Sequence, residues 1–200
     1  MKKSIKTTIT TFSMVAITAL SCMVKIPMEL PTENTSISFL PFTLQNMFAV
    51  LAGILLGVPQ GPSAVGIFLL LGVFGLPIFS SGTVGVAAIS GYTGGFLVSY
   101  YLAAFFSGAI AGRPNINEKK LSIYNILKFF LAAFVGFVFI YVGGTIQYVR
   151  VISCSIIQGI QSCVIPFLVF DGIKLIAVVF IALILRPIIA QYIYTETEIL

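Results

Sequence analysis

Long stretches of apolar residues, interrupted by very few charges, constrain this chain more than any other feature of its sequence. Of its 200 residues, 58% are hydrophobic and 8% are charged, whereas a soluble domain carries about 25% charged residues. So few charges cannot cover a water-soluble globule, and apolar blocks of this length are typical of helices that cross a bilayer. The sequence therefore predicts an all-α integral membrane protein.

The length of the chain limits how many times it can cross the membrane. A spanning helix needs about 20 residues, so the chain has room for six spans, short connections and no large soluble domain. We expect a single transmembrane domain over residues 1–200. Its spans are expected at about residues 7–26, 43–57, 62–77, 91–112, 123–143 and 164–190. Before the last span, apolar residues recur with a helical period over about 146–160, which predicts an amphipathic helix at the membrane interface.

The first apolar stretch allows a second interpretation. The basic start MKKSIK followed by apolar residues resembles a secretory signal, and ALSC resembles a lipoprotein cleavage site with Cys22 as the acceptor. The residue pattern that such sites need before the cysteine is missing, because Leu20 stands one position too close to Cys22. We therefore favour an uncleaved first helix.

Lysine and arginine residues predict the orientation in the cytoplasmic membrane, because they are concentrated on the cytoplasmic side. With the N-terminus inside, most of them fall at or near the inner interface: Lys2, Lys3, Lys6, Arg113, Lys119, Lys120, Lys128 and Arg186. Lys25 and Arg150 fall outside. Both termini are thus expected in the cytoplasm, and the net charge of +5 is explained by topology and contact with membrane lipids rather than by nucleic acid.

Two charges stand inside the last predicted span. Asp171 and Lys174 are three residues apart, so they share one helix face. Each costs about 2.5–3.5 kcal/mol near the bilayer centre on insertion scales. They could be a mutually neutralising pair that merely tolerates burial. We favour a polar pocket that opens to the outer side, because apolar residues would cost less in a helix that only had to span.

Other candidate binding residues lie at the predicted outer ends of helices. Gln45 and Asn46 open the second helix, and Thr93 opens the fourth within GYTGG. Gly91 and Gly94 in that segment could let a ligand approach backbone N–H donors, although small residues also serve close helix packing. Packing alone is expected for the paired glycines Gly53/Gly57 and Gly108/Gly112.

Two loops are expected to cap the same outer end, residues 27–42 and 78–90. Their aromatic residues could exclude water from a bound ligand: Phe39, Phe42 and Phe79. Of the three cysteines, Cys154 and Cys163 could approach each other in an outer loop. With no CxxC spacing, we interpret all three as small apolar residues.

The absences exclude several classes of protein. The chain has no histidine, the commonest general base and metal ligand. It has no G-x-x-x-x-G-K-[ST] motif for ATP hydrolysis, and no second deep carboxylate for an aspartyl dyad. We therefore expect a binding protein that is not an enzyme and that needs neither a metal nor a cofactor.

Four motifs in order resemble one family. FLPFTLQNMFAVLAGILLG, GVFGLPIF, GYTGGFL and PFLVFDGIK are similar to signatures of the BioY family, the biotin-binding subunits of energy-coupling-factor (ECF) vitamin transporters. They cover most of residues 39–178. Such subunits often carry an alanine-x-x-x-alanine docking motif in the first helix, where this chain has Ser13, Ala16 and Ala19.

The resemblance implies a six-helix substrate-binding subunit that holds biotin near the outer surface, beneath the loop between the first two helices. It implies a partner module of one membrane coupling subunit and two ATPase subunits, in which the binding subunit tilts to release its cargo inward. It also implies that Asp171 accepts hydrogen bonds from the ureido ring with help from Thr93. Lys174 would either balance Asp171 or reach the carboxylate tail of biotin.

Three alternatives remain from the sequence. The chain could bind another vitamin as the same type of subunit. It could be a self-sufficient secondary transporter coupled to protonation of Asp171, although no inverted repeat is visible. It could be a membrane enzyme acting on lipids or prenyl chains, although the acidic clusters that hold metal-bound pyrophosphate are missing.

Overall fold

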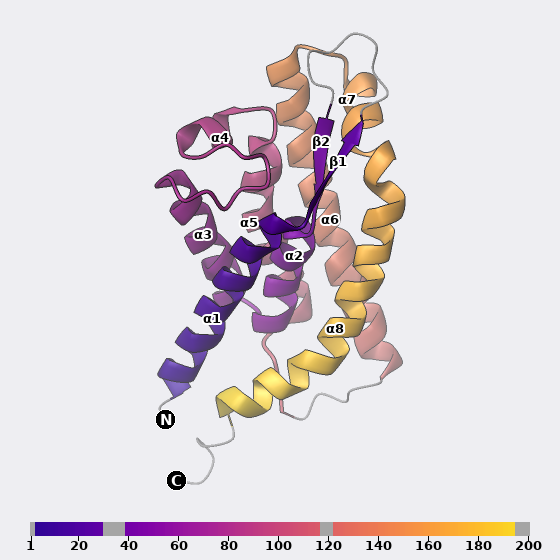
Figure 1. The fold of residues 1–200 in the computed structure, drawn as a ribbon. Helices are drawn as coiled ribbons and strands as arrows, with labels where there is room; N and C mark the ends of the chain where they lie inside the picture. The colour runs from indigo at the N-terminus through magenta and orange to yellow at the C-terminus, as the bar shows by residue number, and fades with distance from the viewer. Residues whose placement is uncertain (1–2, 30–38, 117–121, 195–200) are drawn as a thin grey trace.

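Two long helices, α6 (Ile123–Ile152) and α8 (Leu168–Tyr194), run along one side of the molecule, and shorter helices pack beside them (Figure 1). The computed structural model describes residues 3–29, 39–116 and 122–194. The remaining helices are α1 (Lys3–Leu20), α2 (Gln45–Leu56), α3 (Gln60–Val73), α4 (Val86–Ser90), α5 (Gly94–Ala111) and α7 (Ile156–Cys163). Two 3-10 turns, η1 (Ser21–Met23) and η2 (Ile165–Phe167), follow α1 and α7.

The two ends of the bundle differ. The start of α1 and the end of α8 lie at one end, and α7 lies at the opposite end with a two-stranded ribbon, β1 (Lys25–Glu29) and β2 (Phe39–Thr43) (Figure 1). At the terminal end, the Lys3 ammonium lies over the Tyr194 ring and that of Lys6 over Tyr192. These cation–π contacts tie the first helix to the last.

The expected all-α membrane fold is confirmed, while the helices differ in length. Four segments of the described chain are long and apolar enough to cross a bilayer: Lys3–Met23, Gly94–Ala111, Ile123–Ile152 and Ile156–Tyr194. The expected spans at 43–57 and 62–77 are α2 and α3, with 12 and 14 residues. At 1.5 Å per residue they measure about 18 and 21 Å, less than the ~30 Å hydrocarbon core.

Helix α2 is enclosed by protein along most of its length, and glycines allow that enclosure. A Cβ at Gly53 would come 2.3 Å from the Ala104 carbonyl oxygen of α5, so α2 and α5 are in backbone contact as the spacing predicted. Gly57 and Gly112 have another role besides. They end α2 and α5 with φ of +67° and +69°, a conformation that favours glycine. The expectation of packing alone was wrong for these two.

The interfacial helix expected over about 146–160 is two separate elements. Residues 146–152 are the last two turns of α6, which ends where Ser153 takes a left-handed conformation with φ of +58°. Ser155 then begins α7, because its hydroxyl accepts from the Gln158 amide while the Gln158 side chain accepts from the Ser155 amide. This capping box is readable in the sequence as S-x-x-Q, and it explains why one continuous helix was the wrong prediction.

The expected loop 27–42 lies partly in the antiparallel ribbon, in which Ile26 pairs with Phe42 and Glu29 with Phe39. Pairing satisfies backbone groups that would otherwise be unmet at the membrane edge. Residues 30–38 of that loop lie outside the described residues. The expected loop 78–90 contains the short helix α4 near its end.

Arg186 is fully buried in the lower part of α8 and holds the ends of two other helices. Its guanidinium donates to the Ile54 carbonyl in α2, and at 2.7 and 2.9 Å to the Ala111 and Gly112 carbonyls at the end of α5. Cations favour helix C-termini, where carbonyls lack helical partners. The sequence placed this residue near the inner interface, whereas it serves as a buried anchor. Directly after it, Pro187 stands inside α8, which bends toward its lower end (Figure 1).

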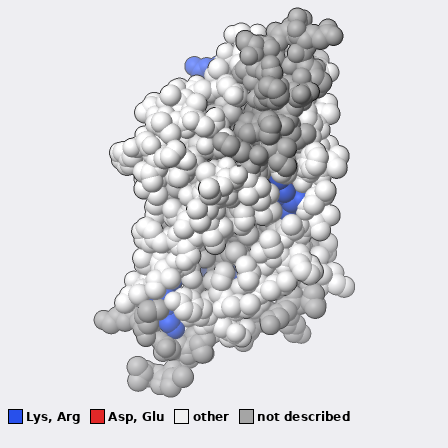
Figure 2. All heavy atoms as spheres, in the orientation of Figure 1, with Lys and Arg blue, Asp and Glu red and all other residues white. Residues whose placement is uncertain are grey.

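The surface agrees with a membrane environment. On the face drawn in Figure 2, uncharged surface dominates, a few lysine or arginine groups appear, and no acidic group is visible. Large apolar side chains stand fully outward on α6 and α8, among them Leu127, Leu131, Ile173, Ile176 and Phe180. Such a surface is stable when lipid chains cover it.

We predict that Arg186→Met destabilises the protein by about 3 kcal/mol or more, because buried carbonyls lose charge-assisted hydrogen bonds and cannot reach water. Unfolding in SDS, followed by circular dichroism of the detergent-purified protein, measures the effect. Arg113→Gln is the control, because this arginine lies near the same end but is exposed. Equal stability of Arg186→Met and wild type would contradict the anchoring role.

Candidate functional site

A cavity opens among the helices in the half of the molecule that carries the ribbon. The space between its lining atoms is about 620 Å³, counting the part open to solvent, which lies within the range of small-molecule sites. Segments far apart in the sequence line it: Phe42, Thr43, Asn46, Ser80, Ser81, Thr93, Phe96, Leu97, Tyr100, Ile140, Tyr141, Cys163, Phe167, Asp171 and Lys174. Aromatic and aliphatic side chains thus share the lining with polar and charged ones.

The charged group is an ion pair within the first two turns of α8. The Lys174 Nζ atom lies 2.6 Å from Asp171 Oδ1, and both residues are buried, with 5% and 6% of their surface exposed. The i, i+3 spacing places the two side chains on the same helix face, as the sequence predicted. Buried charges of this kind are stable only when they are paired and hydrogen-bonded.

Lys174 uses all its donors within the protein. Besides Asp171, its ammonium donates to the Thr43 carbonyl at 2.6 Å and to Asn46 Oδ1 at 3.0 Å. The Phe42 ring centre lies 3.9 Å from the same nitrogen, which is close enough for a cation–π contact. An ammonium has three N–H donors, so three acceptors satisfy it and fix its position.

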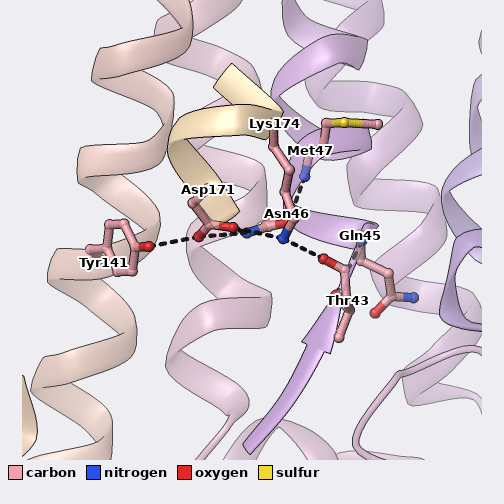
Figure 3. A network of polar contacts seen from close by, with 7 residues as sticks. All are labelled: Thr43, Gln45, Asn46, Met47, Tyr141, Asp171 and Lys174. Atoms are coloured by element: carbon pink, nitrogen blue, oxygen red, sulfur yellow. Dashed lines mark hydrogen bonds and ion pairs between the residues drawn. The ribbon is translucent and has the colours of Figure 1, made fainter. Parts of the chain in front are cut away.

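Asp171 is equally well satisfied. Asn46 Nδ2 lies 3.2 and 3.1 Å from its two carboxylate oxygens, and the Tyr141 hydroxyl donates to Oδ2 at 2.7 Å. Figure 3 shows these side chains converging from α2, α6 and α8, with the backbone of Thr43 completing the network. The carboxylate is therefore a preorganised acceptor at the wall of a cavity.

Aromatic residues form the apolar part of the cavity. Phe42 packs edge-on against Phe170, with ring centres 5.3 Å apart. Phe96 and Phe167 contribute further apolar surface from α5 and η2. Among the described residues, no group of three His, Cys, Asp or Glu side chains could hold a metal ion. The cavity thus combines aromatic surface with polar and charged groups.

Four of the predicted site residues line this cavity: Asp171, Lys174, Thr93 and Phe42. Asn46, also singled out from the sequence, does so as well. Thr93 precedes the first residue of α5, so α5 begins beside the cavity. The side chain of Phe39 lies outside what the structure describes.

Gln45 and Phe79 do not line the cavity. Gln45 is fully buried and points away from the ion pair (Figure 3). It donates to the Ile78 carbonyl at 2.6 Å and accepts from the Ser80 amide at 3.2 Å. Phe79 is buried against Phe68, with ring centres 5.5 Å apart. Both residues fix the segment that carries Ser80 and Ser81 to the cavity, so they act on the site through loop position.

Gly91 and Gly94 also lie outside the lining. The Gln147 side chain donates to the Gly91 carbonyl at 2.7 Å and to the Ile89 carbonyl at 2.7 Å. A Cβ at Gly94 would come 1.8 Å from the Ile89 carbonyl oxygen. A Cβ at Gly94 would also come 2.8 Å from the Gln147 side-chain nitrogen of α6, so for Gly94 the packing alternative that the sequence left open applies. Gly91 contributes its backbone carbonyl to the contact with α6.

Several lining residues escaped the sequence analysis. Tyr141 lies within an apolar span, where a lone hydroxyl among small and aromatic residues is a weak signal. Tyr100 and Cys163 read as core residues by composition. Thr43 takes part through its backbone carbonyl, which no side-chain pattern reveals.

Comparison with known proteins identifies the family. The model of the BioY family matches residues 1–191. The chain belongs to the BioY family. The chain is 38% identical over 152 residues to the biotin transporter BioY of Thermotoga maritima, which covers 74% of this chain and 82% of that protein. It is 33% identical to the biotin transporter BioY of Rhizobium etli, over 62% of this chain and 66% of that protein.

A solved BioY-like structure has the same fold. The S-component for biotin from an ECF-type ABC transporter superposes with a TM-score of 0.75 and 26% sequence identity, over 92% of each chain. The family is one of transporters, and this BioY-family chain is accordingly a multi-pass membrane protein rather than an enzyme. The resemblance of the four sequence motifs is thus confirmed at the level of the family.

We predict that Lys174→Met destabilises the ligand-free protein by about 3–5 kcal/mol, because it leaves the Asp171 charge buried without its partner. The double variant Asp171→Asn/Lys174→Met should recover much of the loss, since no buried charge remains. Unfolding in SDS without ligand compares the three proteins. If the double variant were even less stable than Lys174→Met, the two charges would not stabilise each other, and the interpretation as a neutralising pair would be wrong.

Proposed function

We propose that this protein is the substrate-binding subunit of a biotin importer and that it captures biotin in the cavity beside Asp171. The observation that carries the proposal is a buried, preorganised carboxylate on the wall of an aromatic cavity, in a chain of the BioY family. Biotin combines a polar ureido group with an apolar ring system and a carboxylate tail. The lining matches that combination of chemistry.

Asp171 is the acceptor for the ureido group. A ureido ring presents two N–H donors, which a carboxylate receives in charge-assisted hydrogen bonds. In the ligand-free protein both oxygens of Asp171 already accept from neighbours, namely Lys174, Asn46 and Tyr141. The ligand therefore replaces the weaker contacts, the long Asn46 bonds first. A vitamin without paired donors would leave the carboxylate unsatisfied, which gives selectivity.

Lys174 serves as the counter-ion of Asp171. Its three donors are used by Asp171, Thr43 and Asn46, so none is left for the carboxylate tail of a ligand. The other role, direct contact with the tail, predicts a different response. Biotinamide, which lacks the tail charge, would then bind wild type and Lys174→Met equally. If Lys174 is only a counter-ion, Lys174→Met weakens the binding of biotin and of biotinamide by the same factor.

The open side of the cavity faces the outside of the cell. Cations of the described chain favour this orientation, because Lys3, Lys6, Arg113 and Lys128 lie toward the end where α1 begins. The termini are then cytoplasmic. Thr93 and Phe42 border the cavity and help to hold the ligand, with the ribbon β1–β2 beside them at the outer end (Figure 1).

Inward delivery requires a partner, because the chain has no nucleotide-binding motif of its own. We assign this role to an ECF module of one membrane coupling subunit and two ATPase subunits. Helix α1 offers a contact face, since Ser13 and Ala16 are exposed beside Ile9, Phe12 and Ile17. Small residues among apolar ones suit close helix packing in a membrane.

We predict that the purified protein binds biotin and that Asp171→Asn weakens binding about 100-fold, in line with about 3 kcal/mol for a hydrogen-bonded buried charge. Isothermal titration in detergent measures both. Asn has the same size as Asp, so the cavity keeps its shape.

Thiamine and riboflavin are the control ligands, and Arg113→Gln, an exposed position away from the cavity, is the control variant. Unchanged biotin affinity in Asp171→Asn would reject the assigned role. Tighter binding of thiamine or riboflavin would instead favour the same kind of subunit for another vitamin.

A proton-coupled secondary transporter is the second candidate, because Asp171 is a buried carboxylate beside a cavity. We predict that vesicles containing this chain alone bind biotin without accumulating it under a proton gradient, and that uptake begins when the ECF module and ATP are added. Gradient-driven uptake by the chain alone, abolished by Asp171→Asn, would establish the second candidate instead.

A further inference from the structure

A second hollow, separate from the biotin cavity, lies on the outer surface of the α5–α6 pair. It holds about 1070 Å³ between its lining atoms, counting the part open to the surroundings. Its lining comes from one stripe on each helix: Gly95, Val98, Ser99 and Leu102 on α5, and Gly143, Ile146, Gln147, Arg150 and Val151 on α6, with Ser90 at its outer end. Both stripes follow i, i+3, i+4, i+7 spacing, so each is a continuous helix face.

Small residues form the floor of this groove and larger apolar residues form its walls. A Cβ at Gly95 would come 2.3 Å from the Gly143 carbonyl oxygen, and one at Gly143 would come 1.9 Å from Ser99 Oγ. The two backbones are therefore in contact. Val98, Leu102, Ile146 and Val151 stand outward at 46%, 40%, 64% and 43% exposure. Seven residues of helix give the groove a length of about 10 Å along the axis.

The chemistry of the groove changes toward its outer end. Arg150 lies in the last turn of α6, is exposed, and has no hydrogen-bond or ion-pair partner among the residues that the structure describes. Gln147, one turn before it, is held by the Ile89 and Gly91 carbonyls, which leaves its side-chain oxygen available. A cation thus stands at the end of the apolar groove where α6 ends.

We propose that this groove binds an anionic phospholipid of the outer leaflet, with the phosphate on Arg150 and part of an acyl chain along Gly95, Ser99 and Gly143. The guanidinium recognises phosphate in a bidentate manner. The polar end lies at the membrane surface and the apolar floor lies deeper, which matches the order of groups in a lipid. Arg150 also stands on the side of the protein that is poor in cations, where an unpaired arginine calls for a partner.

A helix of a partner protein fits the groove less well. The floor is short, and the charge stands at one end only. A partner helix would need an acidic residue at the surface, followed by small residues over a single pair of turns. The lipid satisfies charge and shape together, and it is present wherever the protein is inserted.

Native mass spectrometry of the detergent-purified full chain, with phosphatidylglycerol and phosphatidylcholine as probes, tests the proposal. We expect a preference for phosphatidylglycerol, a loss of about tenfold in its affinity in Arg150→Gln, and a smaller loss in Arg150→Lys, which keeps the charge but not the bidentate geometry. Arg113→Gln is the control for loss of a charge elsewhere. Biotin binding by Arg150→Gln should equal that of wild type, so failure here is separate from failure of the proposed function.

Equal binding of both lipids by wild type, or unchanged phosphatidylglycerol affinity in Arg150→Gln, would overturn the proposal. A mass peak for a dimer of this chain that disappears in Arg150→Gln would assign the groove to a second copy of the protein instead. If Arg150→Gln does not fold, the salt dependence of lipid binding by the wild-type protein tests the proposal instead. Rising salt must weaken phosphatidylglycerol binding and leave phosphatidylcholine binding nearly unchanged.

Discussion

The burial of one ion pair, Asp171 with Lys174, determines how the outer half of this protein is arranged. Two charges inside a bilayer are tolerated only with complete hydrogen bonding. The structure provides it from four separate elements: the backbone of Thr43 at the end of β2, Asn46 in α2, Tyr141 in α6, and the pair itself in α8. The same convergence that satisfies the charges leaves a cavity lined by aromatic residues beside them. In the proposed function, stability and ligand recognition therefore depend on the same atoms.

Another buried charge, Arg186, lies in the opposite half of the molecule. Arg186 stands twelve positions after Lys174, about 18 Å farther along α8. It holds the carbonyl ends of α2 and α5, where Gly57 and Gly112 allow those helices to stop. Helix α8 thus contacts α2 in both halves of the molecule. Lys174 binds Asn46 beside the cavity, and Arg186 binds the Ile54 carbonyl near the end of α2. This asymmetry accounts for a cavity that lies in one half of the molecule.

The sequence predicted those features that depend on the cost of burying charge. Asp171 and Lys174 were recognisable because apolar residues surround them, and the all-α membrane fold because apolar blocks define its helices. It could not predict features that depend on tertiary contact. Gln45 and Phe79 have the residue types of a binding site, yet they fix the loop that carries Ser80. The Thr43 carbonyl and the Tyr141 hydroxyl enter the site because β2 and α6 approach α8, which no local pattern records. The motif S-x-x-Q marks the break between α6 and α7 in the sequence. The helical period of apolar residues continues across that break, so the period alone predicted one helix.

The central claim is that the Asp171 carboxylate receives the polar head of the ligand. A crystal or cryo-electron microscopy structure of the protein with biotin tests it most directly. We expect ureido nitrogens within hydrogen-bond distance of the Asp171 oxygens, with the Asn46 amide displaced and Lys174 still paired. Biotin bound elsewhere, with the Asp171, Asn46 and Tyr141 contacts unchanged, would contradict it.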